Sequence, residues 1–171
     1  GMKILFVYPT STTNGNPNKY KKAYLPPLNL AILDRLTYVA DMKHNVKIIN
    51  EYVEDIDFEF EYDLVCITAL TPQAVRAYQI ALEFRKRNIK VIIGGVHPSL
   101  MPEEASHYAD SVVIGEVENI WSTILSDAEA NNLRKIYQDS EFPDLQQLVI
   151  PKWDNMNLSI YRRSFGRRMP R

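Results

Sequence analysis

Short apolar runs alternate with helical stretches along this chain, and their order predicts the fold. The apolar runs are strand candidates at residues 3–8, 46–49, 64–67, 91–93 and 111–114. They are apolar almost throughout, which is typical of parallel strands covered on both faces. Strands that alternate with helices form parallel sheets with right-handed crossovers. We therefore expect an α/β, doubly wound, Rossmann-like or flavodoxin-like parallel sheet of five strands in the order 2-1-3-4-5.

Helical periodicity predicts a helix from Pro27 to about Asp41 and further helices after residues 71, 101 and 119. In the first helix the apolar face is predicted to hold Leu28, Ile32, Leu36 and Val39. The second has Thr71 as its expected N-cap and Pro72 at its first position, where a missing N–H costs nothing. Residues 10–26 lack periodicity and predict a long loop.

The character of the chain changes after about residue 132. Residues 133–171 hold only short apolar pieces and end in an arginine-rich stretch: Arg162, Arg163, Arg167, Arg168 and Arg171. We expect a domain over residues 2–132 and an irregular extension over residues 133–171.

Composition narrows the class of protein. The 171 residues are 46% hydrophobic and 24% charged, with a net charge of -1, which favours neither nucleic acid nor membrane as a partner. Apolar runs fall short of the roughly 18 residues that span a bilayer. The lone Cys66 excludes an internal disulfide, and three scattered histidines predict no metal site. A cytoplasmic location is expected.

Four loops should meet at the carboxyl edge of the predicted sheet, where open α/β folds bind ligands. They contain Tyr8-Pro9-Thr10, Thr68-Ala69-Leu70-Thr71, Gly94-Gly95-Val96-His97-Pro98 and Gly115-Glu116-Val117-Glu118. Two consecutive glycines leave a floor of bare backbone, on which a flat organic group can lie. The alternative is a tight turn that needs positive φ.

The side chains near these glycines leave their roles open. His97 can hydrogen-bond a cofactor, serve as an acid or base, or simply be held in a turn. Glu118 is expected to cap a helix, whereas Glu116 can also line a pocket. Nucleophile triads, triphosphate loops and dinucleotide-binding loops are missing from the sequence.

The chain resembles the N-terminal cobalamin-binding domain of the cobalamin-dependent radical S-adenosylmethionine enzymes. The resemblance rests on KILFVYP (3–9), PPLNLAIL (26–33), HNVKIIN (44–50), YDLVCITALT (62–71), VIIGGVHPSLMPEEA (91–105) and ADSVVIGEVENIW (109–121). It implies that the chain is a piece of a longer protein. A radical domain with a [4Fe–4S] cluster and bound S-adenosylmethionine would follow residue 171 and pack on this domain. For the full-length protein the resemblance implies methyl transfer or a radical cyclisation.

One departure from the family pattern concerns the cobalt ligand. Many cobalamin-binding domains carry Asp-x-His-x-x-Gly after the first strand, whereas residues 9–15 here contain no histidine. The resemblance then implies base-off cobalamin without a protein histidine ligand. Its tail would lie on Gly94 and Gly95 and bond to Thr68 or Thr71, with His97 and Glu116 at the entrance. Gly95→Leu is expected to abolish cobalamin retention without unfolding the domain.

Two other functions stay open from the sequence. Residues 10–15 superficially resemble the phosphate loop of a flavodoxin-like electron carrier that binds FMN, although a helix should then start at once. A domain of this fold can also have lost its cofactor and serve in protein interaction. A receiver would need acids after strands one and three, and neither position has them.

Overall fold

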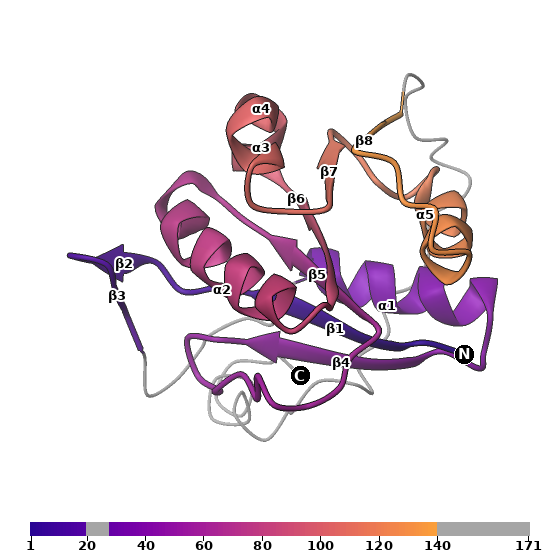
Figure 1. Cartoon of the computed structure of the whole chain (residues 1–171), viewed down its shortest axis with the longest axis horizontal. Helices are drawn as coiled ribbons and strands as arrows, with labels where there is room; N and C mark the ends of the chain where they lie inside the picture. Colours follow the sequence, from indigo (N-terminus) through magenta and orange to yellow (C-terminus); the bar gives the residue numbers. More distant parts are fainter. Residues whose placement is uncertain (20–27, 140–171) are drawn as a thin grey trace, which may run out of the picture.

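A parallel sheet forms the centre of the computed structural model, which describes residues 1–19 and 28–139 (Figure 1). Within these residues the sheet has six strands in the order β4-β1-β5-β6-β7-β8. Their bounds are β1 (Lys3–Tyr8), β4 (Asn45–Asn50), β5 (Leu64–Thr68), β6 (Lys90–Gly94), β7 (Ser111–Ile114) and β8 (Ile136–Gln138). The α/β class and the 2-1-3-4-5 order of the first five strands are confirmed.

The prediction of five strands is wrong, because β8 adds a sixth beside β7. Its single inward side chain, Tyr137, is 4% exposed and belongs to the core. The Tyr137 hydroxyl donates a hydrogen bond to Oδ2 of Asp127, and the Arg134 N–H donates to the same hydroxyl. A three-residue strand with one buried side chain has too little pattern to be recognised. The sheet therefore continues beyond residue 132, and residues 140–171 of the expected extension lie outside the described residues.

Helices cover the sheet on both faces. One face packs against α1 (Leu28–Ala40) and α5 (Trp121–Glu129), and the other against α2 (Ala74–Lys86) and α4 (Pro102–Ser106). Figure 1 shows α2 in front of the strands, with α1 and α5 behind them. A further short helix, α3 (Val96–Leu100), begins directly after β6, where the sequence predicted only a loop.

The buried face of α1 differs from the predicted one. Val39 is 64% exposed, whereas the polar residues Asp34 and Thr37 are buried. Trp121 explains the burial of Thr37, because the indole Nε1 donates to the Thr37 hydroxyl at 2.8 Å. Ile32 and Leu36 are half-buried, and the side chain of Leu28 lies outside the described residues. The face of α1 that carries Thr37, and not the most apolar face, therefore packs against the sheet and α5.

Thr71 is not the N-cap of the second helix, as had been predicted. A 3₁₀ turn, η1 (Thr71–Gln73), precedes α2, and the Leu70 N–H donates to Oε1 of Gln73 at 2.8 Å. The buried Gln73 amide also donates to the carbonyl of Pro9 at 2.7 Å. Gln73 therefore joins the loop after β1 to the start of the helix.

The predicted loop after β1 contains a small hairpin of β2 (Thr12–Thr13) and β3 (Asn16–Pro17). Asn14 and Gly15 connect the two strands with φ values of 51° and 77°. Asn-Gly is the dipeptide most favoured at such positive φ values in two-residue hairpins. The hairpin projects beyond the sheet (Figure 1). Residues 20–26 of the predicted loop lie outside the described residues.

Candidate cofactor-binding site

A cavity of about 450 Å³ lies at the carboxyl ends of β5, β6 and β7. Helices α1 and α5 border it on the covered face of the sheet, and α3 borders it at the edge. Its volume falls within the range of roughly 300–1,000 Å³ that is typical of small-molecule sites. The residues that line it are Asn29, Leu30, Leu33, Cys66, Ile67, Thr68, Ile92, Gly94, Gly95, Val96, Ser99, Leu100, Val113, Gly115, Glu116, Val117, Glu118 and Trp121.

The deep part of the cavity is apolar. The strands contribute Cys66, Ile92 and Val113, while Leu30 and Trp121 come from the covering helices. Burial raises the pKa of the Cys66 thiol, so this side chain stays neutral and acts as an apolar wall. Such a lining suits a flat, uncharged aromatic group.

The two glycines of the predicted floor both line the cavity, but for different reasons. Gly95 has a φ of 102°, and a Cβ there would lie 2.8 Å from the Thr68 hydroxyl oxygen. The backbone itself therefore requires glycine at this position. A Cβ on Gly94 would meet the Cβ of Val113 at 3.5 Å, which is an ordinary contact. The fold thus tolerates a side chain at residue 94, whereas an occupant of the cavity would not.

Ser99 connects the two glycine-bearing loops. Its hydroxyl donates to the Gly95 carbonyl at 2.7 Å and accepts from the Gly115 N–H at 2.9 Å. The Ser99 hydroxyl thereby links the loop after β6 to the loop after β7. The sequence pattern does not indicate Ser99, because only the three-dimensional structure brings it to these backbone groups.

Thr68 presents its hydroxyl to the cavity from the end of β5. Its oxygen accepts a hydrogen bond of 3.1 Å from Nδ2 of Asn29, which lies at the start of α1. The sequence does not indicate Asn29 either, because nothing in its local pattern distinguishes it from a surface asparagine. Together the two side chains form a polar point in a mostly apolar cavity.

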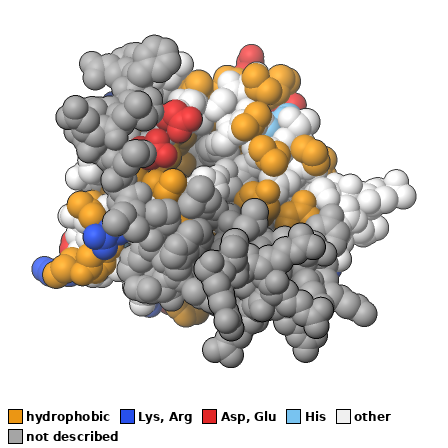
Figure 2. Space-filling view, turned by 180° about the vertical axis from the view of Figure 1, so that it is seen from behind, with side chains coloured by type: hydrophobic (Ala, Val, Ile, Leu, Met, Phe, Trp, Pro, Cys, Tyr) orange, Lys and Arg blue, Asp and Glu red, His pale blue; other side chains and the backbone are white. Residues whose placement is uncertain are grey.

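Glu116 and Glu118 lie at the side of the cavity formed by the loop after β7. Burial, and then the charge of Glu116, raise the pKa of the Glu118 carboxyl. Neither residue caps a helix, because α5 starts at Trp121 and its N-cap is Ile120. The prediction that Glu118 is only a cap is therefore wrong. Figure 2 shows acidic and hydrophobic side chains gathered on this side of the molecule. The hydrophobic side chains of α3 that line the cavity, Val96 and Leu100, are 53% and 69% exposed.

His97 does not line the cavity. It lies in α3 with 9% exposure, and its Nε2 is 2.8 Å from Oε1 of Glu104. Its Nδ1 is 3.2 Å from the hydroxyl of Thr71. Because an ionised carboxylate only accepts, Nε2 carries a proton and faces Glu104. Of the alternatives that the sequence left open, the structure places His97 in a hydrogen-bonded structural position.

The other residues predicted after β5 also lie outside the cavity lining. Ala69 is buried, and its N–H donates to the Gly94 carbonyl at 3.0 Å. Its carbonyl accepts from the His97 N–H at 3.0 Å. Leu70 is 45% exposed, and Thr71 points to His97. These residues join the two loops to each other, and Thr68 alone of the four lines the site.

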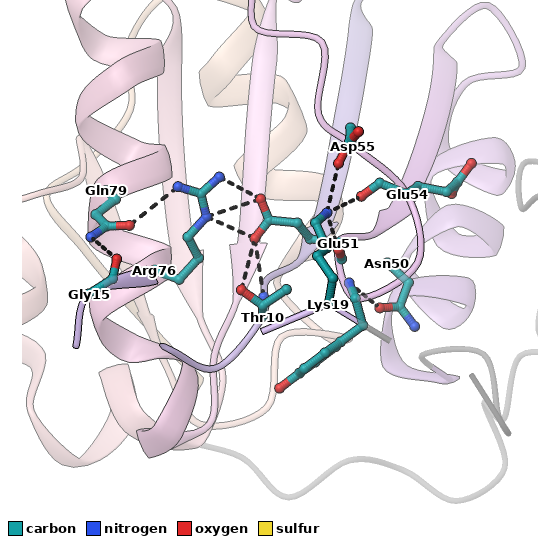
Figure 3. Close-up of polar contacts among 10 residues, drawn as sticks. Thr10, Gly15, Lys19, Asn50, Glu51, Glu54, Asp55, Arg76 and Gln79 are labelled. Carbon is teal, nitrogen blue, oxygen red and sulfur yellow. Dashed lines mark hydrogen bonds and ion pairs between the residues drawn. The ribbon is translucent and has the colours of Figure 1, made fainter. Parts of the chain in front are cut away.

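The predicted residues after β1 hold the hairpin and do not line the cavity. Thr10 is fully buried, and its N–H donates to Oε1 of Glu51 at 3.2 Å. Arg76 binds the same carboxylate, with Nη2 donating to Oε2 of Glu51 at 2.6 Å (Figure 3). Its Nη1 donates to Oε1 of Gln79 at 3.3 Å. Tyr8 packs beside Tyr52 with ring centroids 6.1 Å apart, and Pro9 binds Gln73 through its carbonyl.

One group of possible metal ligands lies at the opposite edge of the sheet within the described residues: Asp41, His44 and Glu129. The Met2 N–H donates to Nδ1 of His44 at 3.0 Å, so this nitrogen is unprotonated and Nε2 carries the proton. Nε2 faces Glu129 at 3.5 Å. A protonated nitrogen cannot bind a metal, so the contact of this N–H with the Glu129 carboxylate accounts for the cluster without an ion. None of the described helices is long and apolar enough to cross a membrane.

A doubly wound parallel sheet with an apolar cavity at its carboxyl edge defines a cofactor- or small-molecule-binding domain. The chain belongs to the B12-binding domain family, because the family model, described as B12 binding domain, matches residues 22–125. The chain is 41% identical over 124 residues to a bacteriochlorophyllide d C-8(2)-methyltransferase of Chlorobaculum tepidum, which covers 72% of this chain and 28% of that protein. It is 29% identical over 170 residues to a bacteriochlorophyllide d C-12(1)-methyltransferase of the same organism, covering 98% of this chain and 36% of that protein. The chain thus spans about a third of the length of these relatives.

Proposed function

We propose that this chain is the cobalamin-binding module of a larger radical S-adenosylmethionine methyltransferase, and that it holds cobalamin base-off without a protein histidine ligand. The observation that carries the proposal is the apolar cavity beneath the bare backbone of Gly94, with the Thr68 hydroxyl inside it. Cobalamin carries a dimethylbenzimidazole tail, which is flat, aromatic and uncharged when it leaves the cobalt.

The cavity residues fit such a tail in both shape and polarity. Leu30, Ile92, Val113 and Trp121 provide apolar walls for the ring. Because Gly94 has no side chain, there is room beside Val113. A Cβ added to Gly94 would lie 3.5 Å from the Val113 Cβ. A flat ring can therefore rest on backbone, and burial of apolar surface would stabilise it there.

The absence of a histidine from the cavity supports the base-off, histidine-free mode. The whole chain has three histidines, and none lines the cavity. His97 is bonded to Glu104, His44 lies at the opposite edge of the sheet, and His107 is exposed after α4. The Thr68 hydroxyl at the end of β5 is then a polar group available to the ring nitrogen of the tail.

The likeness to two methyltransferases supports methyl transfer as the reaction of the whole protein. Cobalamin, when bound, would supply a methyl group for transfer to carbon. This chain would bind the cofactor, orient it and keep water from its tail. The [4Fe–4S] cluster and S-adenosylmethionine would bind in another part of the protein, which would cover the carboxyl edge of this domain.

Visible spectroscopy tests the proposal. The chain is incubated with methylcobalamin, desalted, and its spectrum recorded. We expect cobalamin to be retained, with its absorption shifted to the shorter wavelengths of the base-off form. A parallel incubation with FMN tests the flavodoxin-like alternative. Retained flavin, or no retained cofactor in either sample, would contradict the proposal, and retained cobalamin with an unshifted spectrum would contradict the base-off mode.

A further inference from the structure

The geometry points to Asn29 as a positioning residue: it directs the Thr68 hydroxyl proton into the cavity and so makes the site selective for cobamides whose tail ends in a base with an unprotonated ring nitrogen. This inference rests on the proposed function, because it concerns the same cavity. It goes further in naming the chemical class of the tail and a residue that acts through another.

The orientation of the Asn29 amide is set by its neighbours. Its Oδ1 accepts a hydrogen bond of 3.0 Å from the Leu30 N–H. A backbone N–H can only donate, so the amide oxygen must face Leu30 and the nitrogen must face Thr68. Nδ2 therefore donates to the Thr68 oxygen, at 3.1 Å.

This bond leaves the Thr68 hydroxyl as a donor. A hydroxyl has one proton, and an oxygen that already accepts from Asn29 turns this proton elsewhere. Within residues 1–19 and 28–139, the Thr68 hydroxyl has no hydrogen-bond acceptor of its own. The Gly95 backbone closes one side, since a Cβ there would lie 2.8 Å from the same oxygen. The proton thus points to the cavity, where an acceptor on the ligand can meet it.

A donor in an apolar cavity discriminates between bases. Benzimidazole and purine tails have a ring nitrogen with a free lone pair in the base-off state. Phenolic tails, such as that of p-cresolyl cobamide, have no ring nitrogen. A hydrogen bond of ordinary net strength corresponds to roughly three- to tenfold in affinity. We expect the bond from Thr68 to contribute in this range to the binding of cobalamin and not to that of a phenolic cobamide.

Two substitutions isolate this effect. Asn29→Asp keeps an acceptor for the Leu30 N–H but replaces the donor to Thr68 with an acceptor, which turns the hydroxyl proton away from the cavity. Thr68→Val removes the hydroxyl and keeps the shape. Asn132→Asp is the matched control, because it makes the same change of charge at an exposed loop position before β8. Titrations of the full chain with cobalamin and with p-cresolyl cobamide give the dissociation constants.

We expect Asn29→Asp and Thr68→Val each to weaken cobalamin binding by about three- to tenfold, while p-cresolyl cobamide binding changes by less than about twofold. In the Thr68→Val background, Asn29→Asp should have no further effect, because Asn29 acts through Thr68. Comparing variants with wild type for each ligand cancels the cost of detaching the base from cobalt. Equal losses for both cobamides, or additive losses in the double variant, would overturn the inference and leave the proposed function standing. If wild type binds neither cobamide, the proposed function fails and the inference falls with it.

Discussion

Oε1 of Glu104 lies 2.8 Å from Nε2 of His97, and this contact joins α4 to α3 behind the glycine floor of the cavity. Tyr78 donates to the same carboxylate oxygen at 2.7 Å. His97 does not line the cavity. Its backbone N–H donates to the Ala69 carbonyl at 3.0 Å. The histidine that the sequence offered as a cofactor contact therefore stabilises the loops that form the site.

The carboxylate of Glu104 predicts a pH-dependent contribution to stability. The hydrogen bond from His97, followed by that from Tyr78, lowers the pKa of Glu104. Because the pKa of Glu104 is lower in the folded state, its ionised carboxylate stabilises the fold fully above the ordinary glutamate pKa of about 4.3. This contribution is lost as the pH falls through the lowered pKa of the folded state. Wild type should exceed Glu104→Gln in free energy of unfolding at pH 6, with the difference shrinking towards pH 3. Urea unfolding across this range measures it, and a constant difference would contradict the assignment.

The two glycines should respond differently to substitution. Gly94→Leu should fold normally, because its side chain would not clash with the backbone. It should lose cobalamin retention, because the side chain would fill the cavity. Gly95→Ala should cost about 1–3 kcal/mol in free energy of unfolding, since alanine is strained at positive φ. Gly95→Leu, which the sequence offered as a test of binding without unfolding, is unsuitable for this reason. Urea unfolding and a desalting assay with cobalamin measure the two effects, and a Gly94→Leu variant that retains cobalamin would contradict the placement of the tail.

Ser99→Ala should loosen the floor of the cavity. It removes both the bond to the Gly95 carbonyl and the bond from the Gly115 N–H. We expect about 1–2 kcal/mol lower stability, and a cobalamin affinity several-fold weaker. Ser106→Ala is a matched control, because the Ser106 hydroxyl also donates to a helix carbonyl but lies outside the cavity lining. Equal effects of the two substitutions on cobalamin binding, measured by titration, would argue against the role of Ser99.

Arg76→Met should be among the more destabilising single changes. Glu51 is 2% exposed, and Arg76 binds both of its carboxylate oxygens (Figure 3). Removing one member of a buried pair leaves an uncompensated charge and costs about 3–5 kcal/mol. Arg87→Met is the control, since its pairs with Glu59 and Glu83 are solvent-exposed and should contribute little. The two variants are compared by urea unfolding, where similar midpoints would contradict the prediction.

The regular parts of the fold could be predicted because their signals are local. The five predicted strands are apolar almost throughout, and they occur in the structure in their expected order. The predicted loop after β1, by contrast, contains a hairpin closed by the Asn14-Gly15 turn, a local signal that the sequence also carries. β8 was missed because three residues with one inward side chain carry almost no periodicity.

The predicted site residues that lie outside the cavity lining have another explanation. Tyr8, Pro9, Thr10 and His97 all follow the carboxyl ends of strands, and a topological rule places them at the ligand edge. Neighbouring side chains then turn them elsewhere: Thr10 to Glu51, and His97 to Glu104. Asn29, Ser99 and Trp121 are brought to the cavity from helices far along the chain, where no local pattern distinguishes them.

The sequence by itself therefore determined the alternation of strands and helices, the edge of the sheet at which the site lies, and the glycine pair of its floor. These features depend on periodicity and backbone freedom, which neighbouring residues encode. Only the tertiary structure decided that Gly94 and not His97 faces the cavity, and that the Thr68 hydroxyl is oriented by Asn29. The direction of a side chain depends on partners distant in sequence, such as the Asn29 amide 39 residues away from Thr68, and these partners meet only when the chain has folded.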